Sequence, residues 1–218
     1  MMYNYKNSNI MKRTLLLLAL CLSLSAIGNA QTKKPVRKTT KTKTTQPVKT
    51  PEPPSANGKF KFTDLGFKNT SDEKDYVVIT VEGKSAADIK SSVVSSLSSM
   101  YSNPNKVIST IGDNLINVTA YAPNVFIVPF AGNNVYYSFT YNIKIEIKDG
   151  KIKVDAPAFS NITAREVFMG ETLRNDYIDT NDLYYKLSKT LEQKQEEVAY
   201  IFNSHITKII NGLSNSDW

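Results

Sequence analysis

The sequence predicts an α+β domain, built as a curved antiparallel sheet with two helices packed on one face. Two observations predict this class. Apolar and polar residues alternate over Val135–Ile147, with Tyr136 as the one ambiguous position, and this is typical of a strand with one buried face. Several further strand-like runs lie between two helix-like segments. That order favours a sheet covered by helices on one side over a parallel, doubly wound domain.

The alternating run continues into a hairpin. Asp149-Gly150 follows it, and this pair suits a type I′ turn, in which both central residues adopt a positive φ. A two-residue turn places apolar residues opposite each other on one face and opposite charges on the other. The expected pairs are Ile147 with Ile152, Ile145 with Val154, Ile143 with Ala156, Glu146 with Lys153, and Lys144 with Asp155. Tyr137, Phe139 and Tyr141 share the apolar face and are expected in the core beneath a helix.

Shorter elements precede this hairpin. Residues 60–67 suggest a short edge strand or a packed lead-in, and Asp75–Glu82 reads as a strand ended by Gly83. Ser85 is a suitable helix N-cap, with Asp88 three residues later, for a helix that runs to about Tyr101. Its expected apolar stripe consists of Ile89, Val93, Leu97 and Met100.

Three more strands are expected before the hairpin, at Val107–Ile111, Leu115–Tyr121 and Val125–Phe130. Pro129 has no backbone N–H to donate, which places the last of these at a sheet edge or a bulge.

The C-terminal part is expected to be a loop and a helix. Phe159–Asn181 has no clear period and reads as a long ordered loop. A final helix is expected from Asn181 or Asp182 to about Asn211, with Gly212 as its stop. Its apolar stripe would comprise Leu183, Leu187, Leu191, Val198, Ile201, Phe202, Ile209 and Leu213.

Residues 1–30 have the features of a secretory signal peptide. A short basic region at Met11–Arg13 precedes an apolar run, Leu15–Ile27, and small residues at Gly28 and Ala30 suit signal-peptidase cleavage before Gln31. The run is shorter than the roughly 20 residues of a membrane span. We therefore expect an exported protein, periplasmic or extracellular. Lipidation at Cys21 is the disfavoured alternative, because a lipoprotein signal requires a small residue where Leu20 stands.

Residues 31–58 form a linker rich in Lys, Thr and Pro, without apolar periodicity, and are expected to be disordered. Either this linker is a solvated spacer, or it is a cationic tether for anionic envelope polymers. Its cations are Lys33, Lys34, Arg37, Lys38, Lys41, Lys43 and Lys49. Residues 1–57 carry a net charge of +9, whereas the single domain expected over 59–218 carries −2. This separation disfavours nucleic-acid binding by the domain.

Two segments carry a resemblance to a known family, together with the leader. They are DYVVITVEGKSAADI, from Asp75, and YSFTYNIKIEIKDGKIKVDAPAF, from Tyr137. In these segments the chain resembles secreted domains of unknown function with a fold like the TATA-box-binding protein (TBP), found in Gram-negative bacteria. The resemblance covers roughly residues 70–210. It implies a curved antiparallel sheet with two helices on one side, and it supplies no established activity, cofactor or catalytic residue.

Motifs of enzyme chemistry are absent from the sequence. No Gly-x-Ser-x-Gly, P-loop, His-Glu-x-x-His or calcium-loop pattern occurs, and cleavage after Ala30 would leave no cysteine. The single histidine, His205, falls on or beside the apolar stripe of the final helix, so we expect a packed or surface residue rather than a base or ligand. We therefore predict no catalytic residue, no metal site and no cofactor.

Five residues are candidates for binding. Tyr121, Phe126 and Tyr136 are expected to form an aromatic patch on the open face of the sheet. Arg165 and Arg174 lie in the expected long loop, among several acids. The leading hypothesis is an exported, non-enzymatic binding or envelope-associated module with a cationic tether. The alternative is an envelope-polymer hydrolase with a carboxylate site in the 159–181 region.

Overall fold

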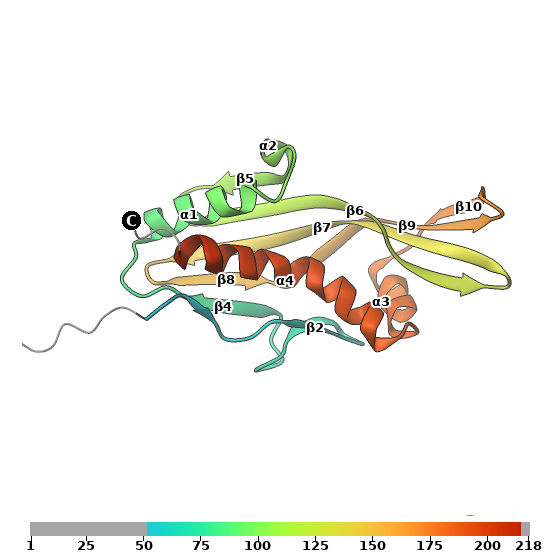
Figure 1. Ribbon diagram of the computed structural model, residues 1–218, viewed down its shortest axis with the longest axis horizontal. Coiled ribbons are helices and arrows are strands. Elements are labelled where there is room, and N and C mark those ends of the chain that lie inside the picture. The colour runs from blue at the N-terminus through green and yellow to red at the C-terminus, as the bar shows by residue number, and fades with distance from the viewer. Residues whose placement is uncertain (1–51, 215–218) are drawn as a thin grey trace, which may run out of the picture. The chain divides into compact units, whose positions relative to one another are not determined.

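A computed structural model describes residues 52–214 (Figure 1). In this part of the chain the fold is dominated by an eight-stranded antiparallel sheet, accompanied by a two-stranded sheet and four helices. The strands are β1 (Ser55–Ala56), β2 (Phe60–Thr63), β3 (Gly66–Asn69), β4 (Tyr76–Thr80), β5 (Ile108–Ile111), β6 (Leu115–Phe130), β7 (Asn133–Lys148), β8 (Lys151–Asp155), β9 (Ala158–Phe168) and β10 (Glu171–Tyr177). The helices are α1 (Ala86–Ser98), α2 (Pro104–Val107), α3 (Thr180–Ser188) and α4 (Glu192–Ser214). Among the described residues, no helix is long and apolar enough to cross a membrane.

Strand β7 is the common strand of the large sheet. One edge of β7 pairs with β6 over almost its whole length. The other edge is shared: β8 pairs with its C-terminal end, and β9 pairs with its N-terminal half. Beyond these two, β4 extends the sheet next to β8, and β10 extends it next to β9. The sheet therefore has two halves that are joined through β7.

The expected hairpin is confirmed in the register nearest its turn. Ile147 pairs with Ile152, Ile145 with Val154, and Glu146 with Lys153. The pairs Ile143–Ala156 and Lys144–Asp155 do not form, because β8 leaves β7 after Val154 and the Ala156 N–H donates to the Asp75 carbonyl at 2.7 Å. The type I′ assignment is also wrong. Gly150 has a φ of 69°, but Asp149 is not among the described residues with positive φ.

The core lies between the large sheet and the helices α1 and α4, which cross the same face of the sheet in Figure 1. The apolar face of β7, including Tyr137, Phe139 and Tyr141, is buried as expected. The opposite face of this half is polar and carries a run of ion pairs, with Lys153 bonded to Asp155 at 2.9 Å. Each fully buried Ile or Phe side chain contributes about 1.5–3 kcal/mol to stability.

The first helix begins as expected and ends earlier. The Ser85 hydroxyl accepts the Asp88 N–H at 3.2 Å and donates to the Asp88 carboxylate at 2.6 Å, which forms the N-cap. Ile89, Val93 and Leu97 are buried, and α1 ends at Ser98 rather than near Tyr101.

The expected final helix is two helices. Asp179 caps α3, and α4 begins at Glu192, so Leu191 falls in the break and is 80% exposed rather than part of the buried stripe. Gly212 lies inside α4 and does not end it. A Cβ at Gly212 would stand 1.7 Å from the Ser96 hydroxyl oxygen of α1. The glycine therefore allows the close approach of α1 and α4.

Two of the expected strands, Leu115–Tyr121 and Val125–Phe130, are a single strand, β6. Its register with β7 shifts between Ala122 and Phe126, where Asn124 has a φ of 47°. The shift adds two residues to β6, so the alternation of faces is preserved and Ala122 and Phe126 point to the same side. The expected strand Val107–Ile111 loses Val107 to the short helix α2.

The prediction of a long loop at Phe159–Asn181 is wrong. This segment forms the antiparallel hairpin β9–β10, with only residues 169–170 in the turn. Both faces of this hairpin are partly exposed, and the apolar alternation that marks a half-buried strand is therefore missing from its sequence.

The fold starts before the expected boundary at Lys59. Ser55 of β1 pairs with Thr80 of β4, and the Asn57 side-chain oxygen accepts the Val78 N–H at 2.9 Å. The hairpin β2–β3 then packs on α4, where the Asn203 side chain bonds both the N–H and the carbonyl of Phe60, at 2.8 and 2.9 Å. The expected signal peptide and the seven linker cations lie outside the described residues.

The register of β7 predicts a sharp contrast between two neighbouring positions. Ile145 is fully buried, so Ile145→Asp places an unpaired charge in the core and should lower the free energy of unfolding by several kcal/mol. Glu146 lies on the wet face in exposed ion pairs, so Glu146→Gln should cost less than about 1 kcal/mol. Urea denaturation of both variants measures the contrast. Equal losses of unfolding free energy in the two variants would mean that the register of β7 is wrong.

Candidate binding groove on the distal arm

Four strands continue past α1 and α4 at the N-terminal end of β7 (Figure 1). We call this part the arm (residues 125–138 and 163–177). Its strands are the second half of β6, the first half of β7, the second half of β9, and β10. Phe130 pairs with Asn133 across the β6–β7 turn, and Asn134 pairs with Val167 of β9. The two hairpin turns therefore lie side by side at the end of the sheet.

The helix-facing side of the arm holds a groove of about 350 Å³ between the strands and α3. Its floor is apolar and comes from three strands and the residue that follows β10: Val128, Phe130, Val135, Tyr137, Ala164 and Ile178. Its rim is charged: Glu166, Arg174, Asp176, Asp182 and Lys186. Because each strand contributes every second residue, the floor is assembled from positions that are far apart in the sequence.

Three of the five charged side chains of the rim have a polar partner. The Arg174 guanidinium forms an ion pair with the Asp176 carboxylate, and the Asn133 side-chain amide donates to the Glu166 carboxylate at 2.5 Å. At the floor, burial raises the pKa of Tyr137, and the negative charge of Asp182 raises it further. The Tyr137 hydroxyl is therefore neutral at physiological pH, so the floor carries no charge of its own.

The opposite face of the sheet carries two of the three expected aromatic residues, Tyr121 before the arm and Tyr136 within it. Tyr121 is 60% exposed, and the Arg165 guanidinium lies 4.9 Å from the centre of the Tyr136 ring. Tyr121 pairs with Thr140, four residues along β7 from Tyr136, so the two tyrosines are about 13 Å apart. They do not form one patch.

Phe126 is not on this face. It is 1% exposed and stacks on Tyr137, with ring centres 4.5 Å apart and planes 5° apart. Because the shift adds two residues, the alternation along β6 continues and Phe126 faces the helices on the same side as Ile116 and Val118, which corrects the prediction of an exposed aromatic. Arg165 and Arg174 lie on different strands and opposite faces, since Arg165 pairs with Tyr136 whereas Arg174 lines the groove.

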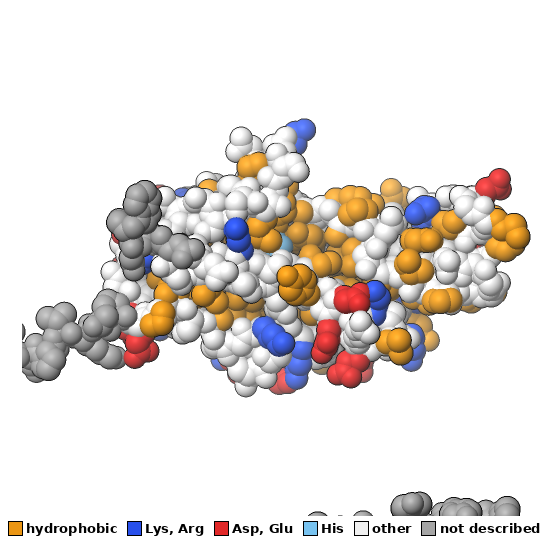
Figure 2. Space-filling model, in the orientation of Figure 1, with side chains coloured by type: hydrophobic (Ala, Val, Ile, Leu, Met, Phe, Trp, Pro, Cys, Tyr) orange, Lys and Arg blue, Asp and Glu red, His pale blue; other side chains and the backbone are white. Residues whose placement is uncertain are grey.

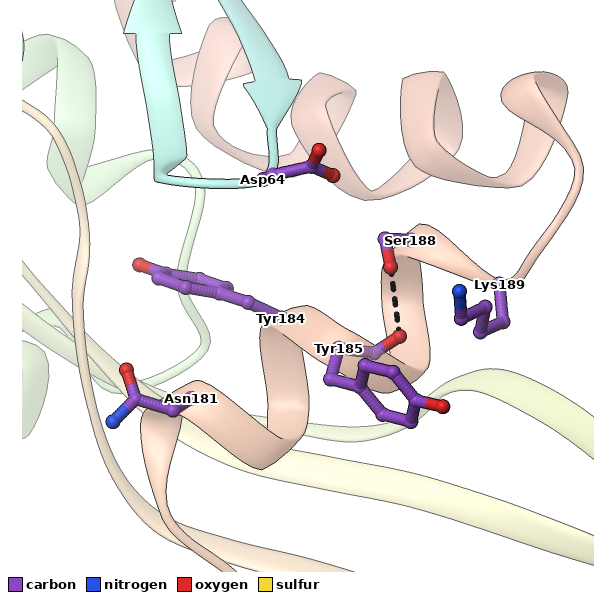
Figure 3. A pocket seen from close by; sticks show the side chains of 6 residues that line it. All are labelled: Asp64, Asn181, Tyr184, Tyr185, Ser188 and Lys189. Carbon is purple, nitrogen blue, oxygen red and sulfur yellow. Dashed lines mark hydrogen bonds between the residues drawn. The ribbon is translucent and has the colours of Figure 1, made fainter.

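A second hollow, of about 330 Å³, lies between α3 and the β2–β3 turn (Figure 3). Asp64 of that turn faces α3, and the Ser188 hydroxyl donates to the Tyr185 carbonyl at 2.9 Å. Tyr184 belongs to an aromatic cluster with Phe62, Phe67 and Phe159. A Cβ on Gly66, whose φ is 99°, would meet the Tyr184 ring at 2.9 Å. The hollow thus borders a tightly packed contact between a hairpin and a helix.

His205 is packed, as expected. It is 1% exposed, and its Nδ1 lies 2.9 Å from the Ile201 carbonyl oxygen, to which it donates. Its Nε2 then accepts from the Tyr101 hydroxyl at 2.5 Å, and the Tyr141 hydroxyl lies 3.4 Å from that of Tyr101. Burial lowers the pKa of His205. These bonds tie the end of α1 to β7 and α4 and leave the ring out of reach of a substrate.

Metal ligands do not gather in the described residues: no group of three or more His, Cys, Asp or Glu side chains lies in a suitable arrangement there. Two carboxylates from residues 159–181, the segment that was expected to be a loop, line the arm groove: Glu166 and Asp176.

Comparisons with known proteins add little to this picture. No family model and no curated protein sequence matches the chain. Among solved structures, the chain is similar to a TBP-like protein from Parabacteroides distasonis, with a TM-score of 0.43 and 10% sequence identity, over 65% of this chain and 92% of that one. A similarity of this size carries no argument about function.

Sequence patterns do not predict the groove because its residues come from four strands and a helix. One signal was present: the run Val125–Phe130 is almost entirely apolar, yet its proline marks an edge. An apolar strand at an edge leaves apolar side chains without cover, and here they form half of the floor.

The buried histidine predicts a pH dependence of stability. Because the pKa of His205 is lower in the folded protein than in the unfolded chain, the unfolded chain binds the proton more readily. The free energy of unfolding should therefore be constant above the unfolded pKa of 6.5 and should fall as the pH drops below it, toward the lower folded value. Urea denaturation of the wild type and of His205→Gln between pH 7.5 and 5.5 measures this.

The variant should show a shallower slope over this interval, whatever its stability at pH 7.5. Glu146 and Asp72 have pKa values lowered by lysine partners, so their contributions are lost only below about pH 4.5. Equal slopes in wild type and variant would contradict the assignment of a buried, neutral His205.

Proposed function

We propose that the protein is an exported, non-enzymatic binding module of the cell envelope, and that the arm groove receives an apolar segment of a protein partner. One observation carries the proposal. The sheet continues beyond α1 and α4 and leaves an apolar floor, including the half-buried Val128 and Val135, that α3 covers only in part.

The anatomy of the groove supports a protein partner. Protein interfaces combine an apolar centre with a polar rim, and aromatic residues are enriched among their strongest contacts. The groove has this arrangement, with Phe130 and Tyr137 on its floor and five charged side chains around it. The rim holds both signs of charge, so it favours a partner with mixed charges over a purely anionic or cationic ligand.

Features outside the described residues support the location. The leader over residues 1–30 supports export, and the seven cations between Lys33 and Lys49 support attachment to an anionic envelope surface. We further propose that the domain is a variant of the TBP-like secreted domains of Gram-negative bacteria, as the two resembling segments indicate. Nucleic acid remains disfavoured by the net charge of −2 over residues 58–218.

The second candidate function is hydrolysis of an envelope polymer. It is favoured by Glu166 and Asp176 lining one groove on neighbouring strands. Against it, the Asp176 carboxylate is paired with Arg174, and Glu166 accepts the Asn133 amide. A general acid and a general base need free access to the substrate, and these bonds restrict it.

Site-specific photocrosslinking in intact cells tests the groove. A benzophenone side chain at Val128 faces the groove, and the same side chain at Ile127 faces the opposite side of the arm. We expect a discrete protein adduct from position 128 and little from position 127. Val135→Lys should abolish the adduct because it places a charge on the apolar floor, whereas Tyr121→Lys on the other face should not.

Comparable adducts from positions 127 and 128 would exclude the groove as the binding surface, and so would an adduct that survives Val135→Lys. If purified protein degrades an envelope polymer and Glu166→Gln or Asp176→Asn stops the reaction, the hydrolase is correct instead. Thermal melts of all variants show whether each remains folded.

A further inference from the structure

The two turns at the end of the arm carry apolar residues in an unfavourable backbone conformation. Each turn has two central residues with positive φ: Ala131 at 48° and Gly132 at 86°, then Met169 at 47° and Gly170 at 87°. This is the type I′ pattern, for which Asn or Asp is strongly preferred before glycine. Here alanine and methionine occupy those positions. Local backbone preference therefore does not account for the choice of residue.

The side chains at these turns are exposed. Met169 is 89% exposed, Phe130 is 64% exposed, and Phe168 is 43% exposed. Figure 2 shows hydrophobic side chains gathered over the outer end of the arm. Glu171 is the only ionisable residue in the stretches 127–133 and 167–172. We call Phe130, Ala131, Phe168 and Met169 the apolar tips.

The geometry of the tips favours one occupant, a lipid bilayer. A protein partner would need a matching hollow for two adjacent protruding turns, whereas the interfacial layer of a bilayer accepts apolar side chains without a fixed shape. Apolar elements that bind membranes at the interface are buried about 5–10 Å deep. Tyr136 lies four residues beyond Gly132 of the β6–β7 turn, about 13 Å behind it, and carries the Arg165 guanidinium over its ring. Tyr and Arg at this depth suit the headgroup layer.

The positive charge of residues 33–49, outside the described part of the chain, also favours a membrane. Stable attachment to a membrane surface generally needs two signals, such as one apolar insertion and one polybasic segment. The seven Lys and Arg residues between Lys33 and Lys49 would supply the second signal toward anionic lipid.

We propose that the apolar tips insert into the interfacial layer of an anionic lipid bilayer, with the basic segment 33–49 as an additional electrostatic contact. Phe130 belongs both to the tips and to the groove floor, whereas Phe168 and Met169 do not line the groove, so a substitution at Met169 tests the tips alone.

Sedimentation with lipid vesicles tests the proposal on the mature chain, residues 31–218. The vesicles contain phosphatidylglycerol and phosphatidylcholine, and binding is measured in 0.1 M and 1 M salt. Met169→Asn removes the apolar side chain while suiting the turn, so the fold is retained or stabilised. Leu191→Asn is the matched control, since Leu191 is 80% exposed in the α3–α4 connection, away from the arm.

We expect Met169→Asn to weaken vesicle binding about tenfold, as loss of one partly buried Met side chain implies, and Leu191→Asn to leave it unchanged. Part of the wild-type binding should persist in 1 M salt, where the Debye length is about 3 Å. A chain with the seven cations changed to Gln should lose only the salt-sensitive part. A fluorophore on Met169→Cys should shift to the blue with vesicles, because it enters the lipid.

Several results would overturn the proposal. Binding that is unaffected by Met169→Asn, or that disappears entirely in 1 M salt, would leave only the basic segment as a membrane contact. Self-association without vesicles that Met169→Asn abolishes would identify a second copy as the occupant. Loss of the Val128 photoadduct in Met169→Asn, with normal vesicle binding, would assign the tips to the protein partner. Val135→Lys should retain vesicle binding, so failure of the groove and failure of the tips are distinguishable.

Discussion

The backbone pairing of β7 is the constraint on which the rest of the structure depends. Its sixteen residues pair with β6 on one edge and share the other edge between β8 and β9. The chain can leave β8 and rejoin the same edge as β9 because Pro157, at the junction, has no N–H to satisfy. One strand thus holds together a half that is covered by helices and a half that is not.

The two halves differ in what covers their apolar face. Over Phe139–Ile147, α1 and α4 exclude water, and the core residues there are almost fully buried. Toward Asn133, α3 alone lies beside the strands, so the same alternation that builds the core leaves Val135 and Val128 half-buried in a groove. The apolar surface of the arm therefore follows from the length of β7 relative to its helices.

Local patterns in the sequence identified the main elements of the covered half, though not all of their ends. Alternation identified β7 and its register with β8, and a serine followed by an aspartate three residues later identified the start of α1. The arm could not be found in this way. The continuation of β6 through its two-residue shift, which keeps Phe126 on the buried face, has no local signature. In addition, β9–β10 lacks alternation because both its faces are partly exposed. The groove depends on pairings between distant strands, which single-strand patterns do not contain.

Residue-resolved amide hydrogen exchange of the unbound protein tests this division of β7 most directly. The amides of Phe139–Ile147 should exchange only through global unfolding, at the free energy that denaturation gives, because helices cover that half. Amides of the arm, over residues 164–176 of β9 and β10, should exchange through local openings of lower free energy. Equal protection along β7 and throughout β9–β10 would contradict the account, since it would mean that the arm is as firmly held as the core.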